Sequence, residues 1–229
     1  MRVKSIMAVR VASVGLVCVV PFLCVLDTRA QTFGPSYSLT SLTNGGDILV
    51  GDKDFSNFFT SGDPYASNIT VTAFTDAGGD YGIEFGGGFV AYDNLMDFQI
   101  GYMVAVTNSA NLISGAALAF NGAVVGGGGG LAEVVEQVIT NMDRTNPYGQ
   151  MAVYATPSSE VLSTNMAINP PQSYLDLGKD ILVDSFTITA YSSISTIDQS
   201  YMQIPEPSTI VLVGLGLFGG LAVLRRRCG

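Results

Sequence analysis

The stretch FQIGYMVAV, residues 98–106, decides the fold class. Its large side chains fall on every second position, at Phe98, Ile100, Tyr102, Val104 and Val106. Successive side chains of a β-strand point to opposite faces, so this spacing places all five on one face. The stretch therefore predicts a strand with one buried face.

The same period of two recurs along the chain, whereas helical periodicity hardly appears. Leu131–Ile139 also carries a helical spacing, but its β-branched content favours a strand. Because the segments are short and are separated by Gly, Asp, Asn, Ser or Pro clusters, we expect an all-β protein, a β-sandwich of jelly-roll type. The further predicted strands are residues 68–74, 81–85, 115–120, 151–155, 181–190 and 194–203, with Gly86-Gly87-Gly88 as a turn or bulge.

The two ends of the chain are apolar. Residues 1–30 combine a basic start, an apolar stretch and the small-residue site Thr28-Arg29-Ala30, which predicts a secretory signal peptide. At the other end, Pro205-Glu206-Pro207 precedes the uncharged run 210–224, and Arg225, Arg226 and Arg227 follow it. A helix of that length would be a short membrane anchor of roughly 22 Å, and the arginines favour a cytoplasmic C-terminus. Residues 31–204 remain as one exported domain, followed by a tail, 205–229.

This tail resembles the PEP-CTERM sorting signal of Gram-negative bacteria, in which a Pro-Glu-Pro motif precedes a short hydrophobic helix and an arginine cluster. The resemblance implies that an exosortase recognises the tail in the membrane. It also implies release or transfer to the cell surface or extracellular matrix, often with exopolysaccharide. The chain would be the substrate of that enzyme, and its sorting residues would be Pro205, Glu206, Pro207, Arg225, Arg226 and Arg227.

The composition of residues 31–204 limits what this domain can do. It holds three basic and seventeen acidic side chains, so its net charge is −14, and nucleic acid is excluded as a partner. It has no cysteine, and the whole chain has no histidine or tryptophan. Histidine-dependent hydrolysis, thiol catalysis and zinc sites built from these residues are therefore unavailable. We expect no cofactor.

A carboxylate-dependent glycoside hydrolase is the common enzyme class that remains, because it needs only two suitably spaced acids. The candidate pairs are Asp93 with Asp97, Glu133 with Glu136, and Asp180 with Asp184. Asp180 and Asp184 are four residues apart and would share one face of a strand. Solvated strand faces and turns of an acidic protein are the simpler interpretation of all three pairs.

A calcium site is a weaker candidate. Asp47, Asp52 and Asp54 cluster around a turn, and carboxylates with backbone carbonyls can hold Ca²⁺. The spacing is not that of an EF-hand, and Lys53 could neutralise its neighbours instead.

The sequence thus predicts an exported, non-enzymatic structural protein of the cell surface. Two alternatives stay open: a secreted carboxylate-dependent hydrolase, and a module that binds a specific polysaccharide. A shallow groove lined by exposed tyrosines would favour the second alternative.

Overall fold

The structure, a computed structural model, describes residues 31–62, 68–125, 129–139, 147–187 and 190–205. The predicted signal peptide, the helix at 210–224 and the sorting residues from Glu206 onward lie outside these ranges. Among the described residues, no helix has the length and apolar character needed to cross a membrane.

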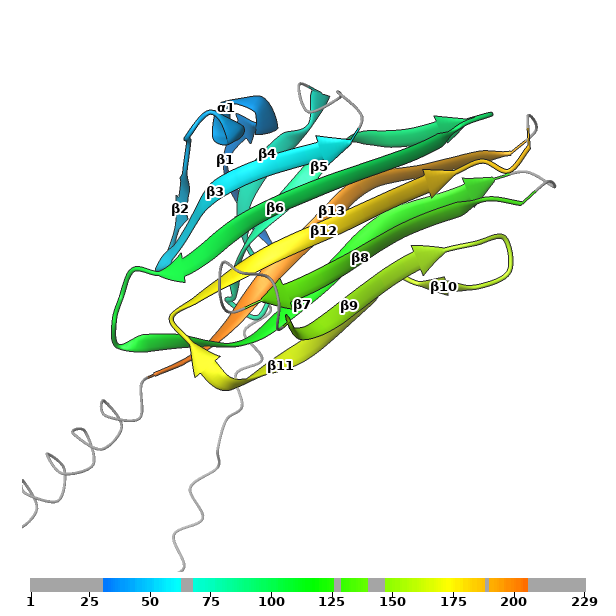
Figure 1. Ribbon diagram of the computed structural model, residues 1–229. Coiled ribbons are helices and arrows are strands. Elements are labelled where there is room, and N and C mark those ends of the chain that lie inside the picture. Colours follow the sequence, from blue (N-terminus) through cyan, green and yellow to red (C-terminus); the bar gives the residue numbers. More distant parts are fainter. Residues whose placement is uncertain (1–30, 63–67, 126–128, 140–146, 188–189, 206–229) are drawn as a thin grey trace, which may run out of the picture.

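Two antiparallel sheets make up the domain and lie face to face (Figure 1). In spatial order the first sheet contains β1 (Thr32–Ser38), β4 (Thr70–Thr75), β5 (Tyr81–Tyr92), β13 (Tyr191–Pro205), β7 (Asn111–Val125) and β11 (Ser163–Gln172). The second contains β10 (Glu160–Val161), β9 (Pro147–Ala155), β8 (Leu131–Ile139), β12 (Tyr174–Asp184), β6 (Leu95–Val106), β3 (Lys53–Gly62) and β2 (Ile48–Val50). One short helix, α1 (Leu39–Thr43), follows β1 and buries Leu39 and Leu42. The all-β sandwich is confirmed, while the narrower jelly-roll type stays a prediction.

Each strand predicted from period-two alternation is present, with imprecise ends, although further strands were not predicted. The stretch at 98–106 lies inside β6, with alternate residues buried as expected, and the ambiguous segment 131–139 is strand β8. The predicted strand 181–190 was wrong in its bounds, because β12 begins at Tyr174 and ends at Asp184. The glycine run 86–88 is a bulge within β5: Gly87 and Gly88 stand opposite a single residue of β13, and both have positive φ angles.

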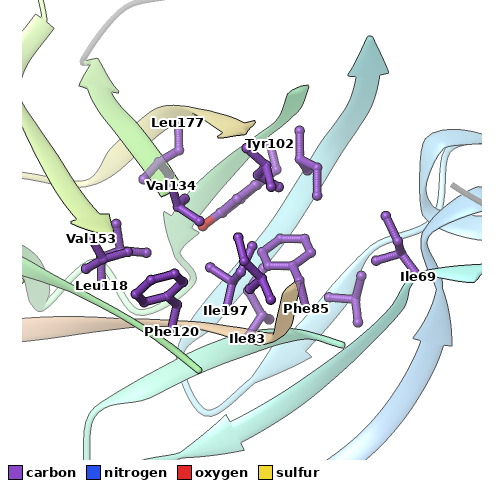
Figure 2. Packing of buried hydrophobic residues seen from close by; sticks show 14 of the residues in the cluster. Ile69, Ile83, Phe85, Tyr102, Leu118, Phe120, Val134, Val153, Leu177 and Ile197 are labelled. Atoms are coloured by element: carbon purple, nitrogen blue, oxygen red, sulfur yellow. The ribbon is translucent and has the colours of Figure 1, made fainter. Parts of the chain in front are cut away.

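The inner faces of both sheets supply the core. Figure 2 shows Leu118, Phe120 and Ile197 from the first sheet packed toward Val134, Leu177 and Tyr102 from the second. Phe55, Phe58 and Phe85 surround the Tyr102 ring at centroid distances of 6.2, 5.4 and 5.7 Å. With no disulfide available to the domain, this interdigitation supplies much of its stability.

Candidate functional site

A row of residues crosses the outer face of the seven-stranded sheet and forms a groove. Direct cross-strand pairing places Gln150 beside Gln137, Gln137 beside Gly178, Gly178 beside Gly101, and Gly101 beside Phe59. Because the two central residues are glycines, no side chain rises from the middle of the row. A shallow trough results, with amide side chains on one side and an aromatic ring on the other.

The shape of this trough is set by its glycines. A Cβ atom added to Gly178 would meet nothing within 4 Å, so the space above Gly178 is open. A Cβ on Gly101 would instead lie 1.9 Å from the Phe59 ring, which therefore covers Gly101. The hollow between them measures about 380 Å³ and also reaches Gln99 and Asp180.

Asp180 and Gln99 form the next cross-strand pair beside the trough. Partial burial raises the pKa of Asp180, and the charge of nearby Asp97 and a hydrogen bond with it raise the pKa further. A hydrogen bond from Gln99 acts in the opposite direction. The groove thus offers amide donors and acceptors, an acidic rim and one aromatic surface, which suits a ligand rich in hydroxyl groups.

The structure arranges the three carboxylate pairs named from the sequence in three different ways. Glu133 and Glu136 are three residues apart in β8, so they point to opposite faces, and Glu136 is buried. Asp93 occupies the turn between β5 and β6 at a φ of 53°. Asp180 and Asp184 do lie on the same face of β12, as alternation requires, but the acid coupled to Asp180 is Asp97 on β6.

Sequence reasoning missed a closer acidic pair on the outer face of the six-stranded sheet. Glu84 of β5 and Asp198 of β13 stand directly opposite each other. Burial, the charge of Glu84 and a hydrogen bond with it raise the pKa of Asp198 to about 6. This pairing can be recognised only when the register between β5 and β13 is known, because 114 positions separate the two residues in the sequence.

Of the three candidate calcium ligands, Asp52 has both of its carboxylate oxygens bound by protein side chains. Lys53 donates to Asp52 Oδ1 at 2.5 Å, and Asn111 donates to Asp52 Oδ2 at 2.7 Å. Asp54 has a raised pKa, caused first by burial and then by the charge of Asp47. Among the described residues no group of three or more acidic, histidine or cysteine side chains is arranged to hold a metal ion.

Both lysines of residues 31–204, Lys53 and Lys179, are buried, although lysine is normally a surface residue. Lys53 is 0% exposed and also donates to Gln203 Oε1 at 2.5 Å. Lys179 is 1% exposed, donates to Glu136 Oε2, and donates to Gln199 Oε1 at 2.6 Å. The alternation carried this signal: Lys179 shares its strand face with Leu175, Leu177, Ile181 and Val183.

Comparison with known proteins identifies the tail. The family model of the PEP-CTERM protein-sorting motif matches residues 203–227. The chain carries a PEP-CTERM sorting motif. The match begins within β13, whose last residue, Pro205, is also the first proline of the motif. The motif implies export, processing by an exosortase, and a tail anchored in the membrane before that processing.

Other comparisons give weaker similarities. No curated protein matches this chain. TmCBM61, solved in complex with β-1,4-galactotriose, is 13% identical, with 66% of this chain and 90% of that chain covered and a TM-score of 0.30. A CBM4 structure is 10% identical, with 74% and 100% covered and a TM-score of 0.29. A family GH12 endoglucanase from Trichoderma harzianum is 12% identical, with 63% and 98% covered and a TM-score of 0.25. These scores are too low to assign a shared function.

Proposed function

We propose that this PEP-CTERM protein is a non-catalytic structural module of the cell surface or extracellular matrix. The observation that carries the proposal is the sorting motif at residues 203–227, which continues directly from strand β13 of the folded domain. In this proposal residues 1–30 are a cleaved signal peptide and residues 210–224 a temporary membrane helix. The exosortase acts on the Pro205-Glu206-Pro207 segment, and the sandwich is the protein that is delivered.

Deletion of the exosortase tests this proposal. In the deletion strain we expect the full-length chain to stay in the inner membrane, whereas the parent strain delivers a shorter form. Replacing Pro205, Glu206 and Pro207 together by alanine in the parent strain should have the same effect, since it removes the recognised segment. An Ala167→Thr variant, changed at an exposed position of β11, is the matched control and should be delivered normally. Unchanged mass and surface delivery in the deletion strain would rule the proposal out.

The arrangement of acids supports a role without catalysis. Glycoside hydrolases hold their two carboxyl groups about 5 to 10 Å apart, so that a sugar and a nucleophile or water fit between them. Glu84 and Asp198 are instead joined by a hydrogen bond, which leaves no room for a sugar between them. The prediction is that the purified protein releases no reducing sugar from β-glucans or galactans.

The groove favours a second function, binding of a neutral polysaccharide. Its amides can donate and accept hydrogen bonds with sugar hydroxyls, and the Phe59 ring offers an apolar face. Asp97 and Asp180 at its rim would repel an anionic polymer. A neutral chain of sugars is therefore the better partner.

Affinity electrophoresis in gels containing neutral polysaccharides tests the groove. Gly178→Thr fills the open space above Gly178 without a backbone clash, so we expect at least a tenfold loss of affinity at unchanged melting temperature. Ala167→Thr adds a side chain of the same size on the other sheet and should bind normally. Equal retardation of Gly178→Thr and the wild type would exclude this groove as the binding site.

A further inference from the structure

Three polar side chains meet in the centre of the sandwich, where the two sheets face each other. Lys179 of β12 pairs directly across the ladder with Glu136 of β8, and Gln199 reaches them from β13 in the opposite sheet. The exposed fractions of Glu136 and Gln199 are both 0%, and the Tyr102 ring lies 5.9 Å from the Lys179 Nζ atom. An amine, a carboxyl and a primary amide are therefore enclosed together in apolar surroundings.

The amine is placed for attack on the amide. Lys179 Nζ lies 2.6 Å from Gln199 Oε1, so the Cδ carbon, one C=O bond of about 1.23 Å further, is less than about 4 Å from the amine. Lys179 also contacts Glu136 Oε2. The amine thus touches both a proton acceptor and an electrophilic group.

Two polar atoms of the cluster have no hydrogen-bond partner among the described residues. They are Gln199 Nε2 and Glu136 Oε1, and both are buried. A buried polar atom without a hydrogen-bond partner lowers the stability of the fold, because it has lost its hydrogen bonds to water. In this cluster the amide nitrogen is the group that would leave, and the free carboxyl oxygen is the group that could give it a proton.

Burial also makes the lysine reactive. Removal from water lowers the pKa of Lys179 well below its usual range, which favours the neutral amine. A desolvated neutral lysine is a competent nucleophile, and an adjacent carboxylate can take up its proton.

We propose that Lys179 and Gln199 join in an intramolecular isopeptide bond between the two sheets, with Glu136 as the proton-transfer group. Lys179 Nζ bonds to Gln199 Cδ, and Glu136 takes the proton that Nζ loses. The bond between Cδ and Nε2 breaks, Glu136 returns the proton to the departing nitrogen, and one ammonia is released. The reaction occurs once in each molecule and needs no co-reactant.

Such a bond would be a covalent cross-link that stabilises the fold, as a disulfide does, in a domain that has no cysteine. It would link β12 to the central strand β13 and restrict the unfolded chain between residues 179 and 199. It would also join the sheet of the groove to the strand that leads into the sorting motif. Because an amide bond, unlike a disulfide, is not formed by oxidation, reducing agents would not reverse it.

The other buried lysine provides an internal control. Lys53 likewise contacts a glutamine, Gln203, and a carboxylate, Asp52. Gln203 is exposed, however, and both Asp52 oxygens are already engaged, one by Lys53 and one by Asn111. Water and these hydrogen bonds remove the conditions for reaction, so Lys53 should keep a free amine.

Peptide mass spectrometry of the denatured full-length protein tests the proposal. A protease specific for lysine should cleave after Lys53 but leave Lys179 intact, because an acylated lysine is not recognised. The peptide that begins at Asp54 should weigh one ammonia less than its sequence, with Lys179 and Gln199 linked in its fragment spectrum. Cyclisation of an N-terminal Gln31 also releases ammonia, but cleavage at Lys53 separates that residue from the peptide.

Two variants distinguish loss of the cross-linking reaction from loss of the fold. Glu136→Gln keeps the side-chain shape and should restore cleavage at Lys179 together with the full peptide mass. Lys53→Arg removes the cleavage site at residue 53, and the longer peptide should still show Lys179 linked to Gln199 in its fragment spectrum. The wild-type spectrum decides the existence of the bond even where a variant does not fold. Complete cleavage at Lys179 with full mass in the wild type would overturn the proposal, and an unreduced yield in Glu136→Gln would overturn the role of Glu136.

Discussion

The hydroxyl pair that joins the two sheets allows a quantitative test of the core. Tyr102 of β6 and Tyr201 of β13 place their hydroxyl oxygens 2.8 Å apart, and their exposed fractions are 2% and 0%. Burial raises the pKa of both phenols above the usual range, so each is a neutral hydroxyl at neutral pH. The interaction is therefore a neutral hydrogen bond inside an apolar core.

Replacing one tyrosine by phenylalanine keeps the ring packing and removes one hydroxyl. The remaining hydroxyl is then buried without its partner, which costs about 1–3 kcal/mol. Removing both hydroxyls eliminates that penalty, so Tyr102→Phe with Tyr201→Phe should cost only about 0–1 kcal/mol. The expected coupling energy is thus at least about 1 kcal/mol, with the double variant more stable than either single variant or close to it.

Urea unfolding at constant pH measures the four proteins of this cycle. The slope of the unfolding free energy with urea should stay constant, since the buried area hardly changes. Tyr92→Phe removes a hydroxyl from an exposed ring and should change the free energy of unfolding by no more than about 0.5 kcal/mol. Single effects that add to the double effect within about 0.5 kcal/mol would refute the pairing.

Two further predictions concern the outer faces of the sheets. The folded-state pKa of Asp198, about 6, is raised above the unfolded value of about 3.9. At pH values between these two, the folded state therefore binds more protons than the unfolded state. Stability should therefore rise as pH falls from about 7 to about 4, by about 1 kcal/mol after allowance for solvent screening. Glu84→Gln should flatten this profile in thermal melts, and an unchanged profile would contradict the pairing. Gly101→Ala should force the Phe59 ring off the sheet and destabilise the fold by about 1–3 kcal/mol. Adding Phe59→Ala should remove most of that penalty, and a full penalty in the double variant would show that the clash lies elsewhere.

Local sequence patterns were enough to predict the strands in which apolar and polar side chains alternate strongly. Tyr102 and its neighbours at even positions define β6 because one face of that strand is apolar. Strands β1, β2, β3, β10 and β11 were not predicted. In β1 and β11, proline, asparagine and exposed polar residues interrupt the alternation. Helix α1 was also missed, because five residues are too few for a helical period to emerge.

The candidate sites depended on pairing between strands that are distant in sequence. Gln137, Gly178 and Gly101 become neighbours only when β8, β12 and β6 take their register. The pair of Glu84 and Asp198 arises in the same way from β5 and β13. A one-residue slip of any of these strands would turn every side chain to the other face, and no local pattern fixes the register between distant strands.

The sequence by itself determined the class of fold and the sorting tail, because both are written in contiguous residues: an alternation of apolar side chains, and a Pro-Glu-Pro motif followed by an apolar run and arginines. The same alternation placed Lys179, Glu136 and Gln199 on inward faces. Only the tertiary structure brought the three together from two sheets, since contact across a sandwich depends on which strands face each other. The physical reason is that side-chain direction is a local property of the strand, whereas the neighbour that a side chain meets is set by register and packing.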